Sequence, residues 1–334
     1  MHSRTLEPGT LIIANSGATL GVAKILGMQC CANDGVAALL NLAKSVSPFY
    51  LAHFINTKTD YLRDVVATGN GQPNLNTTLI GDFNVPFPPT KAEQEAIAEE
   101  LSDADALIES LEHLLAKKRD IKQGAMQELL TGKRRLRGFT GKWELYPLRK
   151  FVLCFIVPMR DKPKRLNGVI PWCRIEDFDG IYLDGSKSGQ GVDTHTIQMM
   201  NLKVYPVGTL LVSCSADLGR CAIVSRPLIS NQTFIGLDMD HAVSSNLFFY
   251  YYMTSIAEEL NNLSSGTTIS YLSREQFEEF GVFVPLDKGE QTAIADVLSD
   301  MDNEIDALEA RLTKVRQLKQ GMMQELLTGR IRLV

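Results

Sequence analysis

Apolar residues recur at alternating steps of four and three along residues 91–130, and again from Ile294 to Leu327. This heptad spacing is typical of a long helix that packs along one seam against another helix. A helix of about 40 residues, rising 1.5 Å per residue, would be about 60 Å long. The seam residues expected to pack against a helix or another subunit, with one glycine in each helix, are Ile97, Leu101, Ile108, Leu111, Leu115, Gly124, Ile294, Leu298, Ile305, Leu308, Leu312 and Gly321.

Proline and glycine mark the two ends of both stretches. Pro88 and Pro285 close the preceding strands and permit a helix to start. Gly132 and Gly329 follow the last periodic residues, at the position where a left-handed residue ends many helices. The pattern therefore predicts where each helix begins and ends.

Two further features lie inside the helices. Past Lys118 and Lys319 the apolar stripe becomes wider than a two-helix seam needs, which predicts an additional partner helix at that end. Gly124 and Gly321 lie within these stretches, where glycine costs about 1 kcal/mol against alanine. Because both copies keep the glycine, we expect it to allow a close approach between helices rather than to be a tolerated kink.

The two helices belong to an internal duplication. Residues 117–136 read KKRDIKQGAMQELLTGKRRL and residues 314–333 read KVRQLKQGMMQELLTGRIRL, at an offset of 197. The match continues upstream through the Glu-Gln pairs at 93–94 and 290–291. A fainter match reaches Gly-Thr-Leu-Ile at 9–12 and Gly-Thr-Leu-Leu at 208–211. One unit of domain plus helix therefore occurs twice.

The two copies are not equal in length. The second copy has about 65 residues before its Gly-Thr-Leu-Leu strand, whereas the first copy has eight before its own strand. We expect Met1 to fall inside a domain whose front part is absent. The expected organisation is a partial first domain at 1–90, a helix at 91–136, a complete second domain at 137–286 and a helix at 287–334.

The second domain has a mixed pattern. Short β-like runs cover Val169–Ile175, Gly208–Cys214, Ala222–Val224 and Phe280–Val284, with a helical stretch at Asn246–Leu260 between them. Strands and helices in this irregular order predict an α+β fold.

Charge bears on possible partners. The net charge of −5 argues against a simple electrostatic DNA binder. The helices carry much of the acid, however, and local basic and polar loop residues could contact phosphates and base edges. The candidate DNA-contacting residues are Arg160, Lys162, Lys164, Arg165, Arg174, Ser215, Arg220, Ser265, Thr267, Thr268, Asn70 and Gln72.

Composition and motifs argue against several other classes. No apolar stretch is long enough to span a membrane. The six cysteines show neither a CxxC pair nor zinc spacing with histidine, so we expect reduced thiols in a cytoplasmic protein that binds no metal. No phosphate-binding glycine loop is present. The Asn-Val-Pro-Phe-Pro-Pro run at 84–89 has the wrong order for an adenine-methyltransferase box, and we expect no intrinsic catalysis.

These motifs resemble one known family. A strand ending in proline, then Glu-Gln-x-x-Ile, a long helix and Lys-Gln-Gly-x-Met-Gln-Glu-Leu-Leu-Thr-Gly is similar to the helical regions of type I restriction–modification specificity subunits. Gly-Phe-Thr-Gly-Lys-Trp at 138–143 and Ile-Pro-Trp at 170–172, with Arg174, also fit the recognition domains of that family.

The resemblance implies a fold and a set of partners. It implies tandem target-recognition domains, each reading half of a double-stranded DNA site, and two helices that pair as an antiparallel coiled coil. It also implies docking of adenine-N6 methyltransferase subunits, which bind S-adenosylmethionine themselves, and of a motor–nuclease restriction subunit. The chain itself would bind no cofactor. The missing front of the first domain puts the specificity of that domain in doubt.

Two alternatives stay open beside a DNA-reading subunit. The chain could be an interaction module that binds methyltransferase subunits without reading DNA. Alternatively, two chains could pair through their helices, present two copies of the second domain and read a palindromic site. The sequence does not reveal which bases are read.

Overall fold

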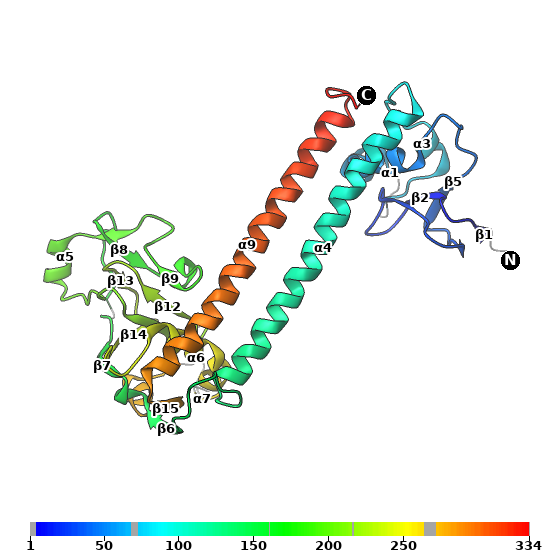
Figure 1. The fold of residues 1–334 in the computed structure, drawn as a ribbon. Coiled ribbons are helices and arrows are strands. Elements are labelled where there is room, and N and C mark those ends of the chain that lie inside the picture. The colour runs from blue at the N-terminus through cyan, green and yellow to red at the C-terminus, as the bar shows by residue number, and fades with distance from the viewer. Residues whose placement is uncertain (1–4, 68–72, 160, 216, 264–271, 334) are drawn as a thin grey trace. The chain divides into compact units, whose positions relative to one another are not determined.

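The structure is a computed structural model, and it describes residues 5–67, 73–159, 161–215, 217–263 and 272–333 (Figure 1). The chain divides into two compact units. Unit 1 comprises residues 1–116 and 306–334, and unit 2 comprises residues 117–305. Each unit therefore contains one part of both long helices, α4 (Lys91–Leu129) and α9 (Lys288–Leu326).

Unit 1 contains a small antiparallel sheet in the order β3-β2-β5, beside the antiparallel pair β1-β4. Its strands are β1 (Thr5–Leu6), β2 (Leu11–Ala14), β3 (Ala23–Ile25), β4 (Cys30–Cys31) and β5 (Val36–Leu39). Its short helices are α1 (Pro48–Asn56), α2 (Thr59–Tyr61), the π-helical turn η1 (Leu62–Val66) and α3 (Thr77–Gly81).

Unit 2 contains sheets in the orders β7-β14-β11-β12-β9, β10-β8-β13 and β15-β6. The pairs β12-β9 and β13-β8 are parallel and the other pairs are antiparallel. The strands are β6 (Trp143–Pro147), β7 (Val152–Ile156), β8 (Ile170–Cys173), β9 (Tyr182–Leu183), β10 (Gly191–Val192), β11 (Leu210–Ser213), β12 (Cys221–Val224), β13 (Ile229–Ser230), β14 (Phe234–Met239) and β15 (Gly281–Pro285).

The helices of unit 2 lie between these strands, so the mixed composition expected for the second domain is confirmed. They are the 3-10 turns η2 (Leu148–Lys150) and η3 (Ile175–Asp177), and the helices α5 (Thr194–Met199), α6 (Asn246–Ser255), α7 (Ala257–Leu263) and α8 (Arg274–Glu279). The single helix expected over Asn246–Leu260 is in fact two helices, because α6 ends at Ser255 and α7 begins at Ala257, with Ile256 between them.

The sheet register repeats between the units. Leu11 to Ala14 of β2 pair with Leu39 to Val36 of β5. Leu210 to Ser213 of β11 pair with Leu237 to Phe234 of β14 in the same sense. The strand counterparts are therefore β2 with β11 and β5 with β14, at offsets of 199 and 198.

Glycine ends both long helices, as the sequence predicts. Gly132 has φ 69° and Gly329 has φ 72°. The Gly132 N–H donates to the Leu129 carbonyl at 3.4 Å, and the Gly329 N–H donates to the Leu326 carbonyl at 3.3 Å. A left-handed residue at this position satisfies a carbonyl that the helix leaves unpaired.

The wider apolar stripe at the end of each helix packs against a short helix in the same unit. Leu129 and Leu130 lie in one buried cluster with Phe248 of α6. Leu326 and Leu327 lie in one buried cluster with Tyr50 and Phe54 of α1. The additional partner helix expected at this end is therefore confirmed in both units.

The close approach expected at the two helix-interior glycines is wrong. A Cβ atom at Gly124 or Gly321 would meet no described atom within 4 Å. Helix packing within the described chain therefore does not require either glycine.

Ion pairs join α4 and α9 inside each unit. In unit 2, Lys118 pairs with Glu304 at 2.5 Å, and Lys122 pairs with Asp302. In unit 1, Arg316 pairs with Glu112 and Lys319 with Asp105, both at 2.5 Å. None of the helices formed by the described residues has the length and apolarity needed to span a bilayer.

A buried glutamine attaches each domain to the start of its long helix. The Gln94 carboxamide oxygen accepts from the Ser47 N–H at 2.8 Å, and its amide donates to the carbonyls of Ser45 and Pro88, both at 3.2 Å. In unit 2 the same role falls to Gln291, which accepts from the Ser245 N–H at 2.9 Å. The side chains that share a motif in the two copies therefore share their contacts.

The Gln291→Met substitution tests this attachment. It leaves three backbone groups without their partner, namely the Ser245 N–H and the carbonyls of Val243 and Pro285. Because a buried group left unpaired costs about 1–3 kcal/mol, we expect the free energy of unfolding of unit 2 to fall by at least about 2 kcal/mol.

Urea unfolding followed by tryptophan fluorescence measures this change, since both tryptophans lie in unit 2. Gln123→Met, an exposed position on α4 in the same unit, is the matched control and should leave the midpoint unchanged. Equal midpoints for the two variants would contradict the anchoring role.

A cluster of one lysine, one aspartate and one ring-containing side chain also occurs in both units, but the ring belongs to tyrosine in unit 2 and to histidine in unit 1. In unit 2, Asp302 pairs with Lys122 and accepts from the Tyr251 hydroxyl at 2.7 Å. In unit 1, Asp105 pairs with Lys319, and the position of the tyrosine is taken by His53, whose Nδ1 lies 4.0 Å from Asp105. Burial lowers the pKa of His53, Asp105 raises it and Lys319 lowers it, and the net direction is downward.

The lowered pKa makes unit 1 sensitive to acid. The unfolded chain takes up a proton at His53 near the usual value of 6.5, and the folded chain takes it up only at lower pH. The stability contributed by neutral His53 is therefore complete above the pKa of the unfolded chain, near 6.5, and is lost as the pH falls from there toward the lower pKa of the folded chain. We expect His53→Tyr, which copies unit 2, to remove this dependence. Hydrogen exchange of residues 5–67 between pH 5.5 and 7.5, corrected for intrinsic rates, measures it, and parallel profiles for both proteins would refute the expectation.

Candidate nucleic-acid interface

A polar cavity of about 330 Å³ opens in unit 2 beside β8 and the turn that precedes β14. Basic, amide, hydroxyl and indole groups share its lining, which consists of Met159, Lys162, Trp172, Arg174, Asn231, Gln232 and Thr233. Strand β8 positions Trp172 and is followed directly by Arg174, while the pairing of β13 with β8 brings the 231–233 turn alongside.

Trp172 carries an unused hydrogen-bond donor. Its side chain is 2% exposed, and its indole N–H has no hydrogen-bond partner among the described residues. A buried donor without an acceptor costs free energy, and such groups in native proteins call for an explanation. An acceptor on a ligand in the adjoining cavity would supply the missing partner.

Arg174 is held in place by two acceptors. Its Nη1 lies 3.2 Å from Glu176, and its Nη2 donates to the Gln190 carboxamide oxygen. The guanidinium has five N–H donors in a fixed fork, so these contacts leave donors for a ligand. The fork matches the O6 and N7 acceptors of guanine.

The lysine-rich loop after β7 adds positive charge at the same edge. Lys162, Lys164 and Arg165 are exposed, and in the described part of the chain none of them forms an ion pair. Lys162 also lines the cavity. Charges with no internal partner are free to contact phosphate oxygens. Arg160 lies outside the described residues.

The remaining sequence candidates divide into three groups. Ser215 is next to Cys214, whose N–H donates to the Thr233 carbonyl at 2.8 Å, so this segment adjoins the turn that lines the cavity. Arg220 instead donates to the Phe178 carbonyl at 2.9 Å and pairs with Asp217, which uses it inside the domain. The candidates outside the described residues are Asn70, Gln72, Ser265, Thr267 and Thr268.

Sequence reasoning missed several lining residues. Trp172 belongs to the Ile-Pro-Trp motif, which in the sequence indicates only the family resemblance. Asn231, Gln232 and Thr233 form a polar run between two buried strands, β13 and β14. An amide-rich run in that context was the available signal, since Asn and Gln amides match the adenine edge.

The helix seam residues have graded burial. Those buried are Ile97, Leu101, Leu111, Leu115, Ile294, Leu298, Ile305 and Leu312. Those half-buried are Ile108, Leu308 and Gly124, and Gly321 is exposed.

The thiols and acids offer little chemistry. All six cysteines are free, and burial raises the pKa of Cys173 to about 12 and that of Cys214 to about 11. Thiols with such pKa values stay protonated near neutral pH and are poor nucleophiles. Among the described residues, no group of three or more His, Cys, Asp or Glu side chains could hold a metal ion.

A family model for the type I restriction modification DNA specificity domain matches residues 3–117 and 158–317. A putative type I restriction enzyme MjaX specificity subunit of Methanocaldococcus jannaschii is 23% identical over 301 residues, which cover 86% of this chain and 69% of that protein. The MjaIX specificity subunit of the same organism is 30% identical over 144 residues, or 42% of this chain and 33% of that protein.

Solved structures share the fold. The S subunit of a type I restriction–modification system from M. genitalium matches 97% of this chain and 84% of its own, with a TM-score of 0.67 and 16% identity. The HsdS subunit from Thermoanaerobacter tengcongensis matches 98% of this chain and 82% of its own, with a TM-score of 0.51 and 17% identity.

Proposed function

Because the chain belongs to the family of type I restriction–modification DNA specificity domains, we propose that it is the DNA-recognition subunit of such a complex and that it has no active site. The observation that carries this proposal is the polar cavity of unit 2. It combines unpaired lysine charge, a buried indole donor without a partner and the amides of a neighbouring turn.

Each component of this edge has a distinct role in reading DNA. Lys162, Lys164 and Arg165 contact phosphates and set the register of the domain on the duplex. Arg174, Gln232 and the Trp172 N–H contact base edges, because these three residues line one cavity. The acidic net charge is no obstacle, since the contact surface is local.

The proposed organisation follows the duplication. Residues 137–286 form a complete recognition domain and residues 1–90 a partial one, and the segments 91–136 and 287–334, which contain α4 and α9, connect them. We propose that these helices pair as an antiparallel coiled coil. Support comes from the order of the ion pairs within each unit. A higher residue number on α4 pairs with a lower residue number on α9, as antiparallel helices require.

The partners proposed for the helices are the other subunits. The exposed helix faces, including Gly321 and the half-buried Gly124, dock two adenine-N6 methyltransferase subunits, which hold S-adenosylmethionine. A restriction motor–nuclease subunit joins this assembly in the cytoplasm. The helices then position the methyltransferase over the site that the domain reads.

Mapping N6-methyladenine in a host that carries this chain and its methyltransferase tests the proposal. We expect methylation at one bipartite motif and, with the purified complex, tighter binding to that motif than to random DNA at moderate salt. Methylation of a palindrome would instead indicate two chains presenting two copies of the second domain. Co-purification with the methyltransferase but no methylated motif would indicate an interaction module, and equal affinity for selected and random DNA would refute DNA reading.

Substitutions at the cavity separate phosphate contact from base reading. Lys162→Ala should weaken binding to all sequences and reduce the salt slope of log K by about 1. Arg174→Ala should reduce the preference for the motif over a single-base mismatch by about 1–3 kcal/mol. Lys203→Ala, an exposed lysine of unit 2 outside the cavity, is the control. Fluorescence anisotropy with both duplexes measures these effects, and a uniform loss for Arg174→Ala would contradict its role in base reading.

A further inference from the structure

The two units share the contacts at the start of each long helix and the register of the central strands, but they differ in the segments that pack over these elements. Each long helix begins with a glutamate and a glutamine that bind the same kinds of groups: Arg332 binds Glu93 in unit 1, and Arg135 binds Glu290 in unit 2. The strands β5 and β14 pair with their inner neighbours in the same register. A residue of unit 1 can therefore be compared directly with its counterpart in unit 2.

In unit 2, residues 143–156 cover one side of this framework. Strand β6 pairs with β15, and β7 pairs with the outer edge of β14. Between them the Leu148 N–H donates to the Phe280 carbonyl at 2.8 Å, and the Phe151 ring lies 5.0 Å from that of Phe249. Leu148 and Phe151 are fully buried, so this segment is part of the core of unit 2.

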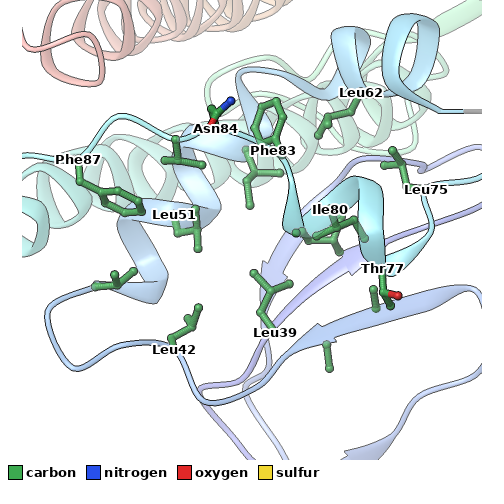
Figure 2. Close-up of a pocket in the computed structure, with 17 residues that line it drawn as sticks. Leu39, Leu42, Leu51, Leu62, Leu75, Thr77, Ile80, Phe83, Asn84 and Phe87 are labelled. Atoms are coloured by element: carbon green, nitrogen blue, oxygen red, sulfur yellow. The ribbon is translucent and has the colours of Figure 1, made fainter.

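In the described part of unit 1, nothing takes the place of this segment. Strand β5 is an edge strand, and residues 83–88, the counterparts of β15, form no strand pair. A cavity of about 440 Å³ lies there instead. Figure 2 shows apolar side chains from β5, α1, α3 and the 83–87 segment converging on it. We name this cavity the open seat; Leu39, Leu51, Ile80, Gly81, Phe83 and Phe87 are among its lining residues.

The residues around the open seat are the counterparts of those that the cover contacts in unit 2. Leu39 corresponds to Leu237, which pairs with Phe155 of β7. Leu51 corresponds to Phe249 at the same offset of 198, and Phe249 contacts Phe151. The side chains that a cover would contact are therefore present and apolar, and Leu39 at the strand edge is only half-buried by the described chain, whereas Leu51 is already buried.

A second cavity marks where the cover begins. In unit 2 the Trp143 indole donates to Glu290 at 3.3 Å, and its ring lies against Gly132, where an added Cβ would be 2.9 Å from it. In unit 1 the counterpart glutamate, Glu93, lines a cavity of about 520 Å³ with Arg332. A Cβ added at Gly329, the counterpart of Gly132, would meet no described atom within 4 Å.

We propose that the open seat of unit 1 binds a strand–turn–strand segment of the same kind as residues 143–156. Its tryptophan donates to Glu93, its apolar turn fills the cavity of Figure 2, and its second strand pairs with the outer edge of β5. Exposed strand edges bind added strands through main-chain hydrogen bonds, and pockets for alternate side chains give specificity. Both requirements are met here.

A labelled peptide with the sequence of residues 140–158 and the change Cys154→Ser tests this proposal with the full chain. We expect saturable binding in fluorescence anisotropy. A second peptide that also carries Leu148→Asp and Phe151→Asp should bind at least tenfold more weakly, because two carboxylates would enter an apolar cavity.

Matched glycine variants locate the binding site. Gly81 lines the open seat, Gly27 lies outside it, and neither has a neighbour within 4 Å of an added Cβ or a positive φ. Gly81→Trp should reduce peptide affinity at least tenfold, and Gly27→Trp should leave it unchanged. Circular dichroism verifies that both variants are folded.

Three results would overturn the proposal. They are the absence of binding with the protein at 100-fold excess over the labelled peptide, equal binding of the two peptides, and equal effects of the two glycine variants. A chain that dimerises in sedimentation, dissociates with Gly81→Trp and does not bind the peptide would show that a second copy fills the seat, and would also overturn it.

Discussion

A buried carboxylate that meets one guanidinium at the start of each long helix constrains the whole framework. In unit 2, Arg135, which follows α4, binds both oxygens of Glu290 in the first turn of α9. Removing a carboxylate from water costs several kcal/mol unless a partner compensates it. Glu290 can therefore be buried only where the segment after α4 lies at the beginning of α9. In unit 1, Glu93 and Arg332 impose the same condition, and that hydrogen bond lowers the pKa of Glu93. Each unit thus couples the start of one helix to the end of the other.

This constraint explains which parts of the fold could be predicted from the sequence. The Glu-Gln pair and the glycine-ended helix repeat almost unchanged because each residue satisfies a buried polar group or a helix terminus, and few replacements could do so. The helix spans followed from a local period, and the caps at Gly132 and Gly329 from local conformational preference. The α+β character of the second domain followed from short strand runs. These features depend on residues that are close in sequence, so pattern alone was sufficient.

The candidate site depended instead on distant residues. Residues 172–174 and 231–233 share a cavity only because β13 pairs with β8 in parallel, a pairing that no local pattern indicates. The missing partner of the Trp172 N–H is likewise a property of the packed domain. For Gly124 and Gly321 the prediction from sequence was wrong. Their repetition predicts a close helix–helix approach, but no described atom lies within 4 Å of a Cβ added at either position. Helix packing within the described chain therefore does not explain why both copies keep this glycine.

Comparison of the two units distinguishes the contacts that attach each domain to its long helix from the segment, residues 143–156, that covers the domain in unit 2. Unit 1 keeps the contacts of Gln94 and Glu93, although its described residues include no counterpart of β6 and β7. The anchoring contacts are therefore common to both units, and in unit 2 the covering segment adds apolar burial and two strand pairs. Anchoring contacts made by other residues than the cover let the periphery of a domain vary while the helix framework persists. In unit 2 the loops that line the polar cavity also lie outside the helix framework, and such loops are where a recognition surface can change its preference without altering the core.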